Sequence, residues 1–158
     1  MFEPLHIYTD GSFADRLKRL PGGTLLSTTQ CVWAAVLIRA GKRVDALHGA
    51  APLTPDRNIT GEAHAVIHGL ERAAELGFSS VVVFHDYNGL SHWANGDWEA
   101  NSETAKWYQT EYSGLSGRFA SLEFRKVKGH SGVYWNEFVD DLAARPRVFP
   151  STPLKFSI

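Results

Sequence analysis

Cysteine is almost absent from this sequence of 158 residues, which contains a single one, Cys31. One cysteine cannot form a disulfide within the chain, and structural zinc sites use several, so neither device is expected to stabilise the fold. A chain of this length buries about 68–70% of the surface that its unfolded form exposes, which is enough for a core of its own. We therefore expect one domain over residues 1–144, in the reducing cytoplasm, with Cys31 in its core.

Long hydrophobic runs and an excess of one charge are also missing. The longest uncharged apolar stretch, Cys31 to Ile38, is far shorter than the ~20 residues of a membrane-spanning helix, so no membrane association is expected. The chain has 16 Lys and Arg against 17 Asp and Glu. A global basic excess would have marked a nucleic-acid binder, but a cluster of catalytic acids can mask a local basic surface. Charge alone therefore decides nothing about nucleic acids.

The pattern of apolar residues predicts the element order βββαβααβα. The predicted strands are residues 5–9, 31–39, 44–50, 79–84 and 122–127, and the predicted helices run from 58 or 60 to 76, 88–95, 103–115 and 134–144. Three meandering strands followed by alternating helices and strands predict an α/β fold: a five-stranded mixed sheet with helices on both faces. Residues 14–30 are expected to form a long exposed loop, and residues 145–158, which contain three prolines, a C-terminal tail.

Acidic residues stand at four of the predicted element boundaries. Asp10 ends the first strand, Glu62 falls in the first turn of the first helix, Asp86 ends a buried strand, and Asp140 or Asp141 lies in the last helix. If the strands that carry Asp10 and Asp86 are parallel neighbours, both carboxylates emerge at the same edge of the sheet. Oxygen ligands of this kind suit Mg²⁺. Taken singly, an acid at such a position is more often a turn former or a helix-start residue than a catalytic group.

Four segments, in this order and spacing, resemble the motifs of the type 1 ribonuclease H family, and the resemblance spans Leu5 to Ala144. They are Ile7-Tyr-Thr-Asp10-Gly-Ser, Asn58-Ile-Thr-Gly-Glu62-Ala, Phe84-His-Asp86, and Val127-Lys-Gly-His130-Ser-Gly followed by Asn136 and Asp140. Residues 86–98 are similar to bacterial and phage variants that lack a Lys-rich basic protrusion. No basic cluster occurs between residues 88 and 117, in agreement with such a variant.

The resemblance implies a ribonuclease H-like fold and an endonuclease that hydrolyses the RNA strand of RNA/DNA hybrids, leaving 5′-phosphate and 3′-hydroxyl ends. Asp10, Glu62, Asp86 and Asp140 would hold two Mg²⁺ ions, with Mn²⁺ as a substitute, about 3.5–4 Å apart. One ion would generate the attacking hydroxide and the other would stabilise the leaving oxygen. His130 would be a mobile proton shuttle, with a solvated loop histidine as the alternative. The family spacing from His130 favours Asp140 over its neighbour.

For the RNA strand, the resemblance implies contacts across the minor groove, where the 2′-hydroxyl is read. Asn58 and Asn88 would reach base edges or ribose, and the backbone around Gly11 and Ser12 would lie close to the RNA. A helix cap for Asn58 and a first-turn polar residue for Asn88 are the structural alternatives.

For the DNA strand, the resemblance implies that Trp93 packs against deoxyribose, too tightly for a 2′-hydroxyl. A place in the core is the alternative. Ser102, with Asn101 and Thr104, could form a pocket for a DNA phosphate, although a helix cap at Ser102 explains it as well. Arg57 is a further candidate for a phosphate contact.

The chain departs from the family between the first two predicted strands, where residues 13–30 form an insertion that carries Arg16, Lys18 and Arg19. It could extend the hybrid-binding surface or be a solvated loop. Two other functions stay open: a resolvase-like DNA nuclease with the same fold, and a non-catalytic hybrid-binding module. We expect a monomer whose tail either lies along the domain or docks to a replication partner.

Overall fold

The computed structural model describes residues 3–87, 89–96, 99–127 and 134–144, and its elements follow the predicted order βββαβααβα. The strands are β1 (Leu5–Arg19), β2 (Leu25–Arg39), β3 (Lys42–Ala50), β4 (Ser80–His85) and β5 (Ser121–Lys126). The helices are α1 (Asn58–Glu75), α2 (Gly89–Asn95), α3 (Glu103–Ser116) and α4 (Tyr134–Ala144). The predictions for Asn88, His130 and the tail at 145–158 concern positions outside the described residues.

The strands form one sheet in the order β3-β2-β1-β4-β5. β1, β2 and β3 make an antiparallel meander, whereas β4 runs parallel to β1 and β5 runs parallel to β4. This arrangement confirms the predicted five-stranded mixed sheet. It also makes β1 and β4, the strands that precede Asp10 and Asp86, direct parallel neighbours.

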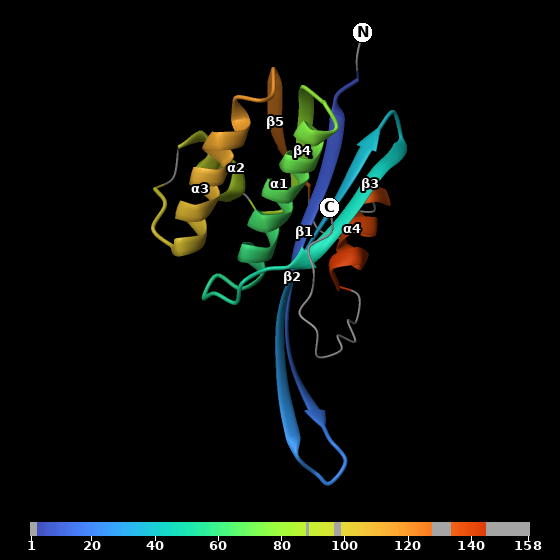
Figure 1. Cartoon of the computed structure of the whole chain (residues 1–158), viewed down its shortest axis with the longest axis vertical. Helices are drawn as coiled ribbons and strands as arrows, with labels where there is room; N and C mark the ends of the chain where they lie inside the picture. Colours follow the sequence, from blue (N-terminus) through green and yellow to red (C-terminus); the bar gives the residue numbers. More distant parts are fainter. Residues whose placement is uncertain (1–2, 88, 97–98, 128–133, 145–158) are drawn as a thin grey trace.

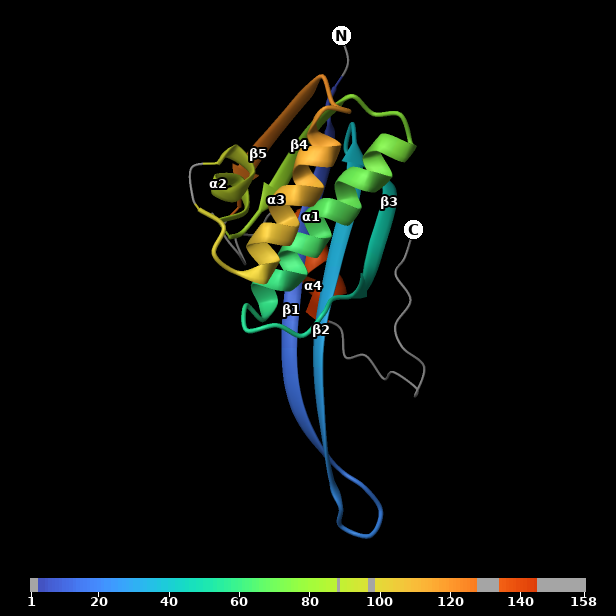
Figure 2. The same cartoon turned by 60° about the vertical axis from the view of Figure 1, so that its left-hand side comes forward.

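Helices cover both faces of the sheet, as predicted. α1, α2 and α3 lie on one face and α4 lies on the other (Figures 1 and 2). Successive residues of a strand point to opposite faces. Leu5 and Ile7 of β1 therefore belong to the larger core beneath α1, while Tyr8 packs with Val139 and Ala143 of α4. Cys31 is buried in the larger core, which confirms its predicted place.

No helix within residues 3–87, 89–96, 99–127 and 134–144 is long and apolar enough to cross a bilayer.

The largest difference from the sequence prediction lies between the first two strands. Asp10 does not end its strand, because β1 continues to Arg19, and residues 14–30 are not a loop, because β2 already begins at Leu25. The two strands stay paired over this whole length, from Asp10 opposite Ala34 to Arg19 opposite Leu25. They form a ribbon that projects from the end of the sheet (Figure 1).

The tip of this ribbon explains why the loop prediction was wrong. Pro21-Gly22-Gly23 is the turn of a hairpin, with φ of 94° at Gly22 and 90° at Gly23, values that glycine adopts readily. The Leu20 N–H donates to the Thr24 carbonyl at 2.7 Å and so closes the turn. The threonine and apolar residues that follow the turn favour a strand. Pro21-Gly22-Gly23 therefore marks a hairpin turn and not an irregular segment.

The start of α1 also differs from the prediction. Neither Asn58 nor Thr60 caps the helix: Arg57 occupies the cap position with a φ of 53°, no side chain caps the helix, and Asn58 is the first helical residue. Glu62 therefore lies in the second turn and not in the first. The other boundaries fit well, since α4 has its predicted bounds and β4, β5 and α3 differ by one residue.

α1 approaches the sheet so closely that two glycines make the contact. A Cβ at Gly11 would meet the backbone nitrogen of Glu62 at 2.3 Å and the carbonyl oxygen of Asn58 at 2.5 Å. A Cβ at Gly61 would meet the carbonyl oxygen of Val32 at 2.7 Å and the Cα of Gly11 at 2.9 Å. Backbone therefore lies against backbone where α1 crosses β1, which fixes the height of α1 above the sheet.

We expect Gly61→Ala to lower the free energy of unfolding by about 1–3 kcal/mol, because the added methyl group has only backbone atoms to displace. The matched control is Gly114→Ala in α3, where a Cβ would meet nothing within 4 Å. That change should raise stability by up to about 1 kcal/mol through helix propensity. Urea denaturation of the two variants measures the contrast, and equal effects of both would contradict the contact.

Candidate active site

Asp10 and Asp86 are brought together by the parallel pairing of β1 and β4. In the register, Tyr8 lies opposite Phe84, and each acid follows its register residue by two positions. The Thr9 hydroxyl donates to the Phe84 carbonyl at 3.0 Å and ties the two strands together just before the acids. The predicted meeting of these two strands at one edge is confirmed, although β1 runs on past this point.

Glu62 reaches the same place from α1 on the larger-core face of the sheet. Its side chain is only 4% exposed, and its carboxylate accepts hydrogen bonds from the backbone N–H groups of Asp86 and Tyr87. These bonds join α1 to the segment that follows β4. The other carboxylate oxygen, Oε1, is buried and has no hydrogen-bond partner among the residues that the structure describes. A buried carboxylate oxygen with no donor is costly, so this atom is suited to an external ligand.

Asp140 reaches Asp10 from the opposite face of the sheet. α4 packs on that face, and the Asp140 side chain hydrogen-bonds to the Asp10 carboxyl group. Asp140 is half-buried, whereas the next residue, Asp141, is exposed. The structure thus places Asp140 and not Asp141 with the other acids, the choice that the family spacing favours.

The crowding of negative groups raises the pKa values of the buried members. Burial, followed by the Asp140 charge, its hydrogen bond and the Glu62 charge, raises the pKa of Asp10 to about 9. Burial and the charges of Asp86 and Asp140 raise the pKa of Glu62 to about 8, although its backbone hydrogen bonds oppose this. Carboxyl groups whose pKa values are raised this far above their ordinary range cluster at functional sites.

The donor set fits a hard divalent cation. All four groups are carboxylates, which supply only oxygen ligands, and Glu62 Oε1 is buried without a donor among the described residues. Among the residues that the structure describes, no three His, Cys, Asp or Glu side chains are already arranged as a metal-binding group. Asp10 and Asp140 share a hydrogen bond, which two carboxyl groups form when one of them is protonated.

The residues expected near the RNA strand lie beside these acids. Gly11 and Ser12 are half-buried on β1, directly after Asp10 and against the start of α1. Asn58 is exposed as the first residue of α1, and its side chain does not cap the helix. Their contacts with RNA stay predictions.

The residues expected near the DNA strand carry structural roles as well. The Ser102 hydroxyl accepts a hydrogen bond from the Ala105 N–H at 3.0 Å, which confirms the alternative of a helix cap. Trp93 is half-buried on α2, with its ring 5.7 Å from that of Tyr87 and 6.3 Å from that of Tyr108. Trp93 packs against the larger core, and part of the residue stays exposed. Its contact with deoxyribose stays a prediction.

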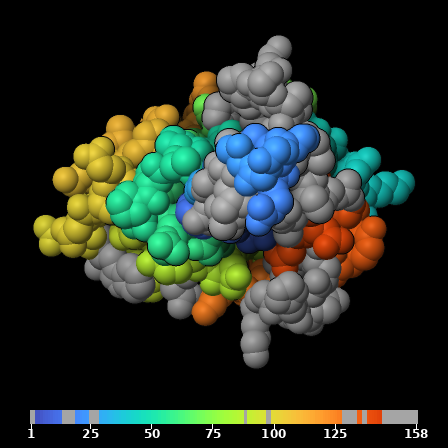
Figure 3. Space-filling view, turned by 90° about the horizontal axis from the view of Figure 1, so that it is seen from below, coloured from blue at the N-terminus to red at the C-terminus, as the bar shows by residue number. Residues whose placement is uncertain are grey.

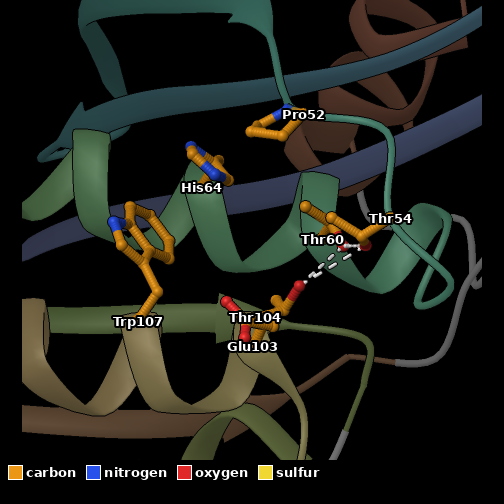
Figure 4. Close-up of a pocket in the computed structure, with 7 residues that line it drawn as sticks. All are labelled: Pro52, Thr54, Thr60, His64, Glu103, Thr104 and Trp107. Carbon is orange, nitrogen blue, oxygen red and sulfur yellow. Dashed lines mark hydrogen bonds between the residues drawn. The ribbon is translucent and has the colours of Figure 1, made fainter.

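A pocket that the sequence did not indicate lies on the outer side of α1, between α1, α3 and the segment before α1 (Figure 4). Its volume is about 230 Å³, and its walls include His64 stacked on Trp107 with ring centroids 4.0 Å apart. Three threonine hydroxyls close one end, and the Thr60 and Thr104 oxygens are 3.0 Å apart. The four acids do not line this pocket, so it is separate from the candidate active site.

Comparisons with known proteins agree with this geometry. A family model described as reverse transcriptase-like matches residues 23–144. The chain is 30% identical over 155 residues to the ribonuclease H of Neisseria gonorrhoeae, covering 92% of this chain and 96% of that protein. It is 33% identical over 153 residues to the ribonuclease H of Chromobacterium violaceum, covering 88% and 91%. The chain belongs to the ribonuclease H family. It is therefore an enzyme of the nuclease class.

Solved ribonuclease H structures share the fold. RNase H1 of the archaeon Halobacterium salinarum superimposes with a TM-score of 0.69 at 20% identity, covering 89% of this chain and 94% of that one. LC11-RNase H1 in complex with an RNA/DNA hybrid gives a TM-score of 0.66 at 18% identity, covering 87% and 92%. The predicted ribonuclease H-like fold is thereby confirmed.

The raised pKa values predict how stability depends on pH in metal-free buffer. Folded Asp10 and Glu62 keep protons that the unfolded chain has released, so stability is full below their ordinary pKa values and is lost as pH rises through about 8–9. His64, whose pKa burial lowers to about 4, has the opposite effect, but only below its ordinary value of 6.5. Thermal unfolding from about pH 7 to pH 9 therefore isolates the acids.

We expect Asp10→Asn to flatten this pH dependence and to raise the Tm near pH 9 by at least about 2–4 °C, the shift that 1 kcal/mol produces at this size. The matched control is Asp141→Asn on exposed α4 surface, which should leave the slope unchanged. A wild-type Tm that rises from pH 7 to pH 9 would contradict the raised pKa values of Asp10 and Glu62 in the folded protein.

Proposed function

We propose that this ribonuclease H hydrolyses the RNA strand of RNA/DNA hybrids at the site built by Asp10, Glu62, Asp86 and Asp140. The observation that carries the proposal is the convergence of these four carboxylates from three elements and the segment after β4, with Asp10 bound to Asp140 and Glu62 interacting with Asp86. The hybrid as substrate is supported by the ribonuclease H relatives and by the neighbour solved with an RNA/DNA hybrid.

The four carboxylates would hold two divalent ions, Mg²⁺ or Mn²⁺ as a substitute. Ions held there would polarise the scissile phosphate and supply the nucleophile and leaving-group stabilisation of two-metal hydrolysis, giving 5′-phosphate and 3′-hydroxyl products. Cations would also replace the proton shared by Asp10 and Asp140 and would give Glu62 Oε1 the partner that it lacks. The backbone N–H groups of Asp86 and Tyr87 would meanwhile keep Glu62 in place.

Other residues would orient the hybrid and move protons. Gly11, Ser12 and Asn58 lie on the surface next to Asp10, where a minor groove would have to sit for the cut to occur. His130, which precedes α4 in the sequence, would carry a proton to and from the reacting oxygens, a task that suits histidine because its ordinary pKa is near neutral. All four acids come from one chain, so one copy suffices and we propose a monomer.

The first test is a gel assay of matched RNA/DNA hybrid, RNA duplex, DNA duplex and single-stranded RNA, with Mg²⁺ and then Mn²⁺. We expect cleavage of the hybrid alone, in its RNA strand, and a loss of at least about 100-fold for Asp86→Asn, as removal of a metal ligand costs at least as much as loss of its supporting bonds. Cleavage of DNA would indicate a resolvase-like enzyme. Hybrid binding without any cleavage would indicate a binding module.

The second test separates the adjacent acids of α4. Asp140→Asn should abolish cleavage, because this side chain contacts Asp10, whereas Asp141→Asn should stay within about twofold of wild type, as most exposed substitutions do. Both variants change one charge on the same helix turn, and thermal unfolding of each confirms that the variant is folded. Equal losses in the two variants would contradict the assigned role of Asp140.

A further inference from the structure

The ribbon formed by residues 14–30, called the arm below, is a candidate binding element. Its strands pair from Ala14 opposite Gln30 to Arg19 opposite Leu25, beyond the part of the sheet that the helices cover. At about 3.3 Å per residue, β1 carries the chain about 30 Å from Asp10 to Arg19. The arm thus begins next to the active-site acids and extends well beyond them.

The root of the arm is fixed to the domain. Phe13 packs against the larger core, and the guanidinium carbon of Arg57 lies 5.4 Å from the centre of its ring. On the other strand, the Cys31 thiol donates to the Arg57 carbonyl at 3.4 Å. Together with the backbone contact at Gly11, these interactions fix the direction in which the arm leaves the active site.

The arm differs in charge from the rest of the chain. It holds three basic residues, Arg16, Lys18 and Arg19, and one acidic residue, Asp15, whereas the whole chain has a net charge of −1. The strand that returns from the tip, residues 24–30, has no charged residue and is rich in serine and threonine. Arg57, exposed at the root, adds a fourth cation between the arm and Asn58.

Viewed along the arm, parts of the domain are visible on several sides of its tip. Figure 3 looks from the tip, in blue, toward the domain, with the segment before α1 in teal, the segment after β4 in yellow-green and α4 in orange-red around it. A duplex that reaches Asp10 would pass close to the root of the arm, because Asp10 and the arm lie on the same continuous strand, β1. A two-stranded ribbon is narrow enough to enter a nucleic-acid groove, and the minor groove of an A-form helix is wide and shallow.

We propose that the arm binds the sugar-phosphate backbone of the hybrid beyond the part that contacts the active-site acids, through the basic residues of its first strand, Arg16, Lys18 and Arg19. This inference rests on the proposed hybrid-cleaving function. Three basic residues within four positions give this strand a local positive charge, which the chain does not have between residues 88 and 117. Phosphate contacts of this kind add affinity and salt dependence without sequence preference.

The test compares two triple variants in steady-state cleavage of a long hybrid at several salt concentrations. Arg16→Gln/Lys18→Gln/Arg19→Gln removes the cations of the arm. Arg39→Gln/Lys42→Gln/Arg43→Gln is the matched control, because it removes three cations from the hairpin at the other end of β2. We expect the arm variant to raise KM about tenfold or more with kcat unchanged, and to reduce the slope of log KM against log salt by about 2 to 3.

Two further measurements keep the result specific. Arg16→Lys/Arg19→Lys keeps the charges and should keep the wild-type KM. A hybrid that covers the active-site acids but is too short to reach the arm should be cut equally well by the wild type and the arm variant. A wild-type KM and salt slope in the arm variant would overturn the proposal, as would an equal loss in the control variant. If the wild type cuts no hybrid at all, the proposed function fails first and the arm is not the cause.

Discussion

The contact between Gly11 and Gly61 is the constraint on which the site depends. It lets the backbone of α1 lie directly on β1, with 2.9 Å between the Gly11 Cα and the place of a Cβ on Gly61. Glu62, the next residue of the helix, is thereby placed next to Asp10, the residue before the other glycine. A larger side chain at either glycine would lift the helix and separate two acids of the proposed metal site. The glycines serve the chemistry through packing and take no part in it themselves.

The same closeness makes the folded state electrostatically costly. Four carboxylates share a small region, and the pKa values of Asp10 and Glu62 are raised because burial and the neighbouring charges disfavour their ionised forms. The fold tolerates this cost because the surrounding structure holds the strands, through the β1–β4 pairing and the large core beneath α1. Stability given up at a functional site is a common pattern. A divalent cation is the natural counter-charge, which connects the stability of this region to its proposed activity.

Much of the architecture could be predicted from the sequence, because periodicity and turn residues are local signals. The element order, the mixed sheet and the bounds of α4 followed from them. The arm was missed because Pro21-Gly22-Gly23 reads equally well as a loop or as a hairpin turn, and only pairing between distant residues decides. The cap of α1 was missed because Arg57 adopts a positive φ that its residue type does not suggest. The Asp140 contact with Asp10 depends on how α4 docks across the sheet, so helical periodicity alone left Asp141 in competition.

The claim that the four carboxylates together bind the two divalent cations is tested most directly by anomalous diffraction. The crystals would contain the protein, a hybrid and Mn²⁺. We expect Mn²⁺ peaks enclosed by Asp10, Glu62, Asp86 and Asp140, with Glu62 Oε1 among the ligands. A map in which Mn²⁺ lies elsewhere, or in which Glu62 Oε1 still has no partner while the hybrid is bound, would contradict the metal site and with it the proposed mechanism.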